Sequence, residues 1–95
     1  MSCYFVAQIH IKDWITYQKY LNGFDVIFKN YKGTVVSVDD DPVKLEGDWP
    51  YTRTVLIYFP NETEAKKWYE SVEYQQLAEY RRKASQANIV LVKGR

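Results

Sequence analysis

The chain has 95 residues, 17% of them aromatic, and its 13 basic and 12 acidic side chains leave a formal net charge of +1. That length suits one domain, which would bury about 65% of its unfolded surface, and it excludes a second domain. The near-neutral charge, with residues 81–83 as the only basic run, argues against nucleic acid as a partner. One cysteine and one histidine exclude an intramolecular disulfide and a four-ligand zinc site.

The N-terminus has neither the basic region nor the apolar stretch of a secretory signal. The longest apolar run, Val55 to Phe59, is too short to cross a bilayer. The sequence therefore predicts a cytoplasmic protein with no membrane partner. Because it holds no Gly-rich phosphate loop and no cluster of metal ligands, we expect no nucleotide or metal cofactor.

Residues 3–11 alternate between two faces, which predicts a strand. One face carries Phe5, Ala7, Ile9 and Ile11, and the other carries Tyr4, Val6, Gln8 and His10. The period then changes to that of a helix, with Asp13 in position to cap its start and Gly33 to end it. The apolar stripe of this helix consists of Trp14, Tyr17, Leu21, Phe24, Phe28 and Tyr31.

A second strand is predicted over 34–38, where β-branched residues predominate. The run Asp39-Asp40-Asp41-Pro42 ends it. Three adjacent carboxylates raise the alternative of a metal site, but they lack the spaced oxygen ligands of a calcium loop, so a solvated turn is favoured. Residues 43–45 are interpreted as a continuation of the sheet before the loop that contains Trp49.

The third strand is predicted from Arg53 to Phe59, and Pro60 ends it. Asn61 and Ser71 are each in position to cap a helix. The first of these helices buries Ala65, Trp68 and Tyr69, and the second carries Tyr74, Leu77, Ala78, Arg81 and Ala84 on one side. Residues 88–92 form the last strand.

The resulting βαββαβ order predicts a ferredoxin-like α+β sandwich with all helices on one face of an antiparallel sheet. The other face would present Tyr4, Val6, Gln8, His10, Leu56 and Tyr58. Such a face is too apolar to stay exposed on a monomer. A two-fold homodimer that pairs these faces as an α/β barrel is the simplest solution.

Four motifs together resemble a known family: Leu45-Glu46-Gly47-Asp48-Trp49-Pro50, Phe59-Pro60, Ala65-x-x-Trp68-Tyr69 and Ser71-x-Glu73-Tyr74-Gln75. They are similar to the DUF-thirteen-thirty family, a domain of unknown function. The resemblance implies a ferredoxin-like subunit of the dimeric α/β-barrel superfamily. That superfamily includes cofactor-independent monooxygenases, isomerases, haem-degrading enzymes and ligand-sensing domains, so fold alone does not carry a function. Thr34 and Val38 stand where the family often has arginine, which argues against an acidic-ligand site on those two positions.

His10 is the first candidate site residue, because its ordinary pKa lies near neutrality. It is predicted on the sheet face away from the helices, as a general acid or base for a small substrate. The alternative is a solvated histidine near a strand end. No serine or cysteine motif accompanies it, so a nucleophilic triad is unsupported.

The loop residues Glu46, Asp48 and Trp49 form a second candidate group with Arg53. An indole and oriented charges are suited to hold a polar ligand. Alternatively, Arg53 pairs with Glu46 or Asp48 only to fix the loop.

Arg81 interrupts an apolar helical stripe. An unpaired buried charge is costly, so we expect Arg81 to reach the surface or to pair with a carboxylate such as Glu46. Trp68, Tyr69 and Tyr74, at helical spacing, are interpreted as core.

The leading hypothesis is a homodimeric, cofactor-independent enzyme that acts on a small metabolite, in a monooxygenase- or isomerase-like reaction. His10 would be the acid or base, Tyr58 and Trp49 would line the pocket, and Arg53 would orient the substrate. The alternatives are a non-catalytic small-molecule-binding module and a dimeric scaffold without a ligand.

Overall fold

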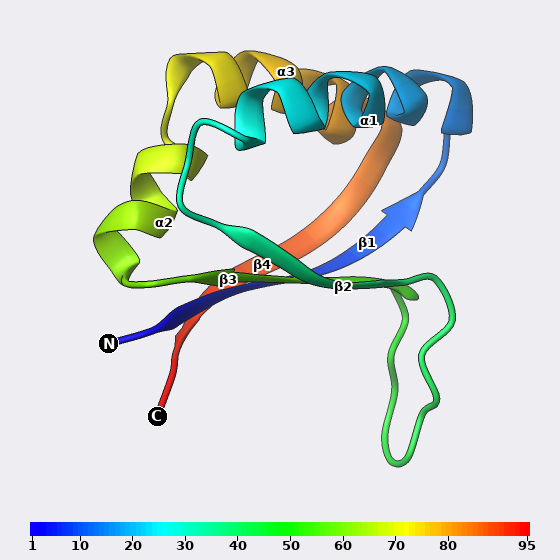
Figure 1. The fold of residues 1–95 in the computed structure, drawn as a ribbon. Helices are drawn as coiled ribbons and strands as arrows, with labels where there is room; N and C mark the ends of the chain where they lie inside the picture. Colours follow the sequence, from blue (N-terminus) through cyan, green and yellow to red (C-terminus); the bar gives the residue numbers. More distant parts are fainter.

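The computed structural model describes all 95 residues and contains four strands and three helices. In chain order they are β1 (Cys3–Ile11), α1 (Trp14–Phe28), β2 (Thr34–Asp39), β3 (Arg53–Phe59), α2 (Glu62–Tyr69), α3 (Val72–Ala84) and β4 (Ser85–Lys93). The strands pair antiparallel in the order β2-β3-β1-β4. All three helices cover one face of the sheet (Figure 1). The predicted ferredoxin-like architecture is confirmed.

All three helix starts follow from local side-chain chemistry. The side chains of Asp13, Asn61 and Ser71 accept hydrogen bonds from the third backbone N–H that follows each of them. Each such bond satisfies a donor that the first turn of a helix leaves without a partner. The three predicted N-caps are confirmed.

The role predicted for Gly33 is wrong. Helix α1 ends at Phe28, Lys29 occupies its C-cap, and Gly33 has no positive φ. The constraint on this glycine is instead close packing, because a Cβ added to Gly33 would lie 2.5 Å from Phe28 Cζ and 2.7 Å from Phe59 Cε1. A similar constraint holds at Gly23, where a Cβ would lie 2.6 Å from Leu77 Cδ1. Gly23 therefore lets α1 approach α3 closely.

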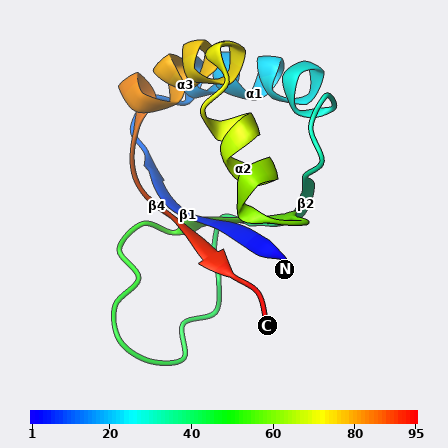
Figure 2. The same cartoon turned by 90° about the vertical axis from the view of Figure 1, so that its left-hand side faces the viewer.

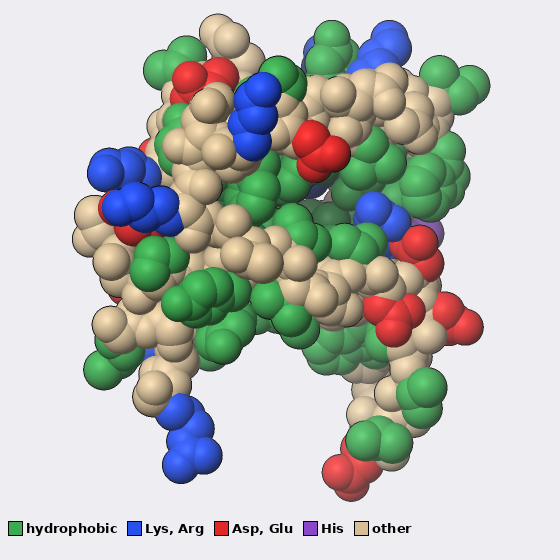
Figure 3. All heavy atoms as spheres, in the orientation of Figure 1, with side chains coloured by type: hydrophobic (Ala, Val, Ile, Leu, Met, Phe, Trp, Pro, Cys, Tyr) green, Lys and Arg blue, Asp and Glu red, His purple; other side chains and the backbone are tan.

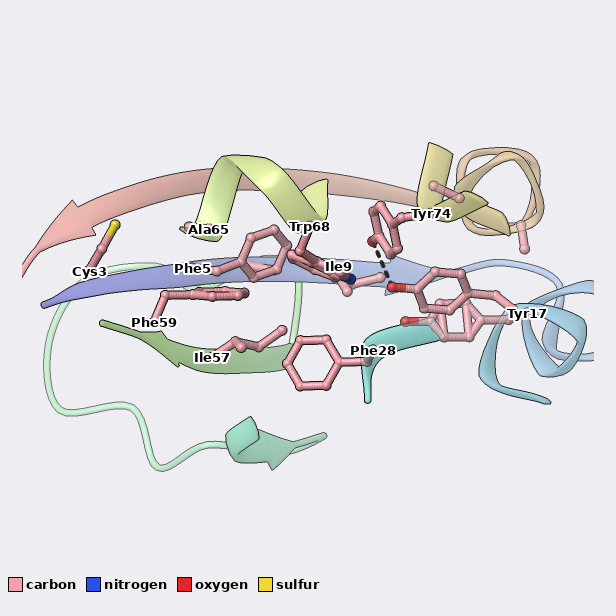
Figure 4. Close-up of a cluster of buried hydrophobic side chains, with 14 residues drawn as sticks. Cys3, Phe5, Ile9, Tyr17, Phe28, Ile57, Phe59, Ala65, Trp68 and Tyr74 are labelled. Atoms are coloured by element: carbon pink, nitrogen blue, oxygen red, sulfur yellow. Dashed lines mark hydrogen bonds between the residues drawn. The ribbon is translucent and has the colours of Figure 1, made fainter. Parts of the chain in front are cut away.

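The core lies between the sheet and the helices, and Trp68 stands at its centre with 1% of its surface exposed. Its ring centroid is 4.3 Å from that of Tyr74, 5.3 Å from that of Phe5 and 5.6 Å from that of Phe59. Figure 4 shows these aromatic rings gathered between the sheet and α2. Trp68 and Tyr74 are thus confirmed as core residues.

A long loop, residues 40–52, leaves the sheet on the side away from the helices (Figures 1 and 2). Residues 43–45 belong to this loop, so their predicted continuation of the sheet is wrong. A bulge between Val35 and Ser37 shifts the register of β2 against β3. None of the three helices is long and apolar enough to cross a membrane, and no three His, Cys, Asp or Glu side chains are grouped to hold a metal ion.

Candidate functional site

A cavity of about 260 Å³ lies between α1, α3 and the helix-covered face of the sheet. We call it the helix–sheet cavity. Figure 3 shows hydrophobic side chains around a hollow between the helix layer and β2. The apolar part of the lining comprises Phe5, Ile9, Leu21, Phe24, Val35, Val38, Val55, Ile57 and Ile89, and the polar part comprises Tyr17, Tyr20, Asp25, Arg53 and Arg81.

Arg53 enters this cavity because it shares the strand face of Val55 and Ile57 in β3. Its Nη1 lies 2.7 Å from Asp40 Oδ1, so the predicted pairing with Glu46 or Asp48 is wrong. Burial lowers the pKa of Arg53, but the hydrogen bond and charge of Asp40, together with Tyr17, outweigh burial and raise it. The guanidinium carbon lies 5.5 Å from the centroid of the Tyr17 ring. Arg53 is therefore a fixed cation, already neutralised by Asp40.

Arg81 lies deep in the fold, with 4% of its surface exposed. It makes no ion pair, and its Nε has no hydrogen-bond partner. The prediction of a surface position or a carboxylate partner is therefore wrong. Burial lowers the pKa of Arg81, but Tyr74 and Tyr20 outweigh this effect and raise it, so the side chain stays cationic. Its guanidinium carbon lies 5.9 Å from the centroid of the Tyr20 ring.

Buried tyrosines surround the two arginines. The hydroxyl oxygens of Tyr20 and Tyr74 lie 2.8 Å apart in a hydrogen bond, drawn as a dashed line in Figure 4. Burial raises the pKa of Tyr17, Tyr20 and Tyr74 above that of a free tyrosine. These phenols are consequently protonated at neutral pH and act as hydrogen-bond donors, not as bases.

Asp25 is the one carboxylate in the cavity lining. It is exposed, follows Phe24 on the buried side of α1, and makes no side-chain hydrogen bond or ion pair. Sequence reasoning missed both Asp25 and Tyr20 as cavity residues. A usable signal exists in retrospect, because Tyr17, Tyr20 and Phe24 line one side of α1 and Asp25 directly follows Phe24.

The other predicted site residues lie elsewhere. His10 is exposed on the opposite face of the sheet, where its ring stacks on Tyr51 at a centroid distance of 6.1 Å. Tyr58 lies on that same face, its ring 5.9 Å from the ring of Tyr4. Neither residue lines the helix–sheet cavity.

The loop residues form a separate groove. Glu46 and Trp49 line it together with Pro42, Val43, Lys44, Leu45 and Thr54. The indole Nε1 of Trp49 donates to Thr54 Oγ1 at 2.9 Å, and Asp48 is exposed outside the groove lining. Of the seven predicted site residues, the structure therefore brings Arg53 and Arg81 together in the helix–sheet cavity and Glu46 and Trp49 together in the groove.

Solved structures with the same fold come from several bacteria. The RPA0582 protein of unknown function from Rhodopseudomonas palustris superposes with a TM-score of 0.79 at 12% identity, covering 99% of this chain and 82% of that one. SnoaB, a cofactor-independent oxygenase from Streptomyces nogalater, gives a TM-score of 0.67 at 14% identity, covering 99% and 93%. Identities this low establish the shared fold alone.

A putative antibiotic biosynthesis monooxygenase from Nitrosomonas europaea shares the fold with a TM-score of 0.63 at 10% identity, covering 98% of this chain and 89% of that one. Among curated proteins no match is found. The family described as "Domain of unknown function (DUF1330)" matches residues 2–95. Because this match spans nearly the whole chain, the protein belongs to that family.

Proposed function

We propose that the protein is a cofactor-independent enzyme acting on a small metabolite held in the helix–sheet cavity. The observation that carries this proposal is the composition of the lining. Two guanidinium groups and one free carboxylate meet in a space that is otherwise apolar and aromatic. Arg53 and Arg81 lie mostly away from solvent, where fixed charges act more strongly on a developing charge than they do in water, and Asp25 lies at the exposed side of the cavity.

The chemistry suited to this lining is proton transfer at a carbon next to a carbonyl group. Asp25 would accept the proton, and the arginines and protonated tyrosines would stabilise the enolate. In an isomerase-like reaction the proton returns to a different carbon. In an oxygenase-like reaction the anion of a CH₂ group gives electrons to dioxygen, and the resulting hydroperoxide loses water to leave a carbonyl. Proton abstraction is common to both.

The first step can be tested without knowing the natural substrate. Phenylacetone and phenylpyruvate, two small ring-bearing carbonyl compounds, are incubated in D₂O, and loss of the signal of the proton next to the carbonyl is followed by proton NMR. We expect exchange faster than the spontaneous rate with at least one compound. Asp25→Asn should lower the enzymatic rate by about 100-fold or more, because it removes the general base.

Asp41→Asn is the matched control, because Asp41 is an exposed aspartate outside the cavity lining and its removal changes the net charge equally. It should leave the rate unchanged. Binding of these compounds without exchange would favour the non-catalytic ligand-binding alternative. The absence of both binding and exchange would contradict the proposed function.

A catalytic role for His10 stays a prediction, and the proposed mechanism does not use this residue. The sheet separates it from the helix–sheet cavity. His10→Ala should therefore leave the exchange rate intact if Asp25 is the base.

We also propose that the protein is a homodimer that pairs the uncovered sheet faces. Cross-strand neighbours place Tyr58, Tyr4 and Val92 in one apolar row and Leu56, Val6 and Val90 in the next. Figure 3 shows hydrophobic side chains on this underside, between the projecting loop and the C-terminus. Exposed apolar surface of this extent is typical of protein interfaces.

Sedimentation velocity tests the dimer. Val90→Lys should give a monomer, because a charge would enter the middle of the proposed interface, and Val90 is 56% exposed in the single chain and so tolerates lysine there. Val26→Lys is the matched control, since Val26 is 59% exposed on α1 at the helix side. A wild-type protein that sediments as a monomer would contradict the proposed interface.

A further inference from the structure

The two cations of the helix–sheet cavity are not equivalent. Arg53 is neutralised by Asp40 at 2.7 Å. Arg81 is more deeply buried and has no acidic partner. The Nε of each arginine is buried without a hydrogen bond, so the difference between them is the ion pair. The polar neighbours of Arg81 are the phenols of Tyr20 and Tyr74, which carry no charge at neutral pH. The deep part of the cavity therefore holds one positive charge that phenols stabilise and no carboxylate pairs with.

A buried cation of this kind is costly for the folded protein unless an anion meets it. The carboxylate is the anion that best fits a single guanidinium, because its two oxygens match two parallel N–H donors of the fork. A phosphate dianion calls for a second free cation, and Arg53 is already paired with Asp40. The charges present thus favour one singly charged group at Arg81.

The remaining lining defines the body of the ligand. Leu21, Phe24, Val35, Val55 and Ile57 offer no hydrogen-bonding side chain. The volume of about 260 Å³ lies just below the range of about 300–1,000 Å³ typical of ligand pockets. Such a space suits a body of about one ring and excludes long chains or linked sugars.

We propose that the substrate is a small monocarboxylate with an apolar, ring-sized body, and that Arg81 binds its carboxylate. This inference rests on the proposed function, in that it takes the helix–sheet cavity as the site. With the carboxylate on Arg81, Arg53 is left to face the oxygen that gains charge during proton transfer. Arg81 is then the residue that determines specificity for acids over neutral carbonyl compounds.

Phenylacetate and phenylacetamide test this directly, because they have nearly the same shape and differ in charge. Binding is measured by titration calorimetry, and the binding site is located by methyl NMR shifts of Ile57 and Ile89. We expect phenylacetate to bind about 10- to 100-fold more tightly than phenylacetamide, the range given by charge-assisted hydrogen bonds. The preference should disappear in Arg81→Met and weaken in Arg81→Lys, which keeps the charge and loses the fork.

Arg82→Met is the matched control, because Arg82 is the neighbouring arginine on α3, is exposed and is absent from the cavity lining. It should keep the wild-type preference. If circular dichroism shows that Arg81→Met does not fold, the inference is tested by the ratio of the affinities for phenylacetate and phenylacetamide. This ratio is then compared between the wild type and Arg81→Lys.

Three results would overturn the inference. Equal binding of the acid and the amide in the cavity would reject the carboxylate class and leave the proposed function standing. Tighter binding of inorganic phosphate than of phenylacetate, lost in Arg81→Met, would assign Arg81 to phosphoryl groups. Failure of both probes to shift the cavity methyl groups would reject this inference and the proposed function together.

Discussion

Replacing Trp68 by alanine is expected to lower the free energy of unfolding by about 3 to 5 kcal/mol. The indole is fully buried, and six further aromatic rings lie within 6.1 Å of it, centroid to centroid, on the sheet and on all three helices. Removing it opens a cavity at the point where the sheet meets all three helices. Urea denaturation followed by circular dichroism measures the loss.

Trp68→Phe is the control for this prediction. The indole Nε1 is buried without a hydrogen-bond partner, so phenylalanine removes volume without breaking a hydrogen bond. We expect a clearly smaller loss than for alanine. An alanine variant within about 1 kcal/mol of the wild type would mean that the core collapses around the vacant space, and would contradict the central role given to Trp68.

Replacing Arg81 by methionine is expected to have the opposite effect on the unliganded protein, raising its free energy of unfolding by about 1 to 3 kcal/mol. Arg81 carries a charge into the interior with no acidic partner. Methionine is similar in length, is flexible enough to fill the space and needs no solvation. Functional sites commonly retain such destabilising residues.

Arg82→Met, one residue further along α3, should change the free energy of unfolding by about 0.5 kcal/mol or less, since Arg82 is exposed. Both variants are measured by urea denaturation in buffer free of carboxylates, because a bound acid would stabilise the wild type. A loss of stability in Arg81→Met comparable to that of a core truncation would show that the tyrosines satisfy the guanidinium, and that it needs no ligand.

The sequence predicts those parts of the fold that depend on residues close to one another along the chain. The alternation of β1 and the caps at Asp13, Asn61 and Ser71 are local, so pattern and capping chemistry are sufficient to find them. Gly33 shows the limit of this reasoning. Its position suggested a helix cap, whereas its actual constraint is contact with the ring of Phe59, distant in the sequence.

The site was harder to predict, because it depends on which residues the tertiary structure brings together. Asp40, Glu46 and Asp48 all lie within thirteen residues of Arg53, and only the path of the loop decides that Asp40 is its partner. The bulge in β2 turns Val38 toward the cavity, which strict alternation does not foresee. Arg81 was expected to have a partner because buried charges usually do; the exception marks the site.

The proposed binding of an acidic ligand by Arg81 in the helix–sheet cavity can be followed by NMR of the arginine Nε–H groups during a phenylacetate titration. Because Arg81 Nε–H has no hydrogen-bond partner in the free protein, we expect its resonance to shift strongly and saturably. Arg82 Nε–H already donates a hydrogen bond to Glu79, so its resonance should not shift. If phenylacetate binds and the Arg81 resonance does not move, Arg81 does not bind the carboxylate. The site would then lie elsewhere, for example at the groove of Trp49 or on the sheet face of His10.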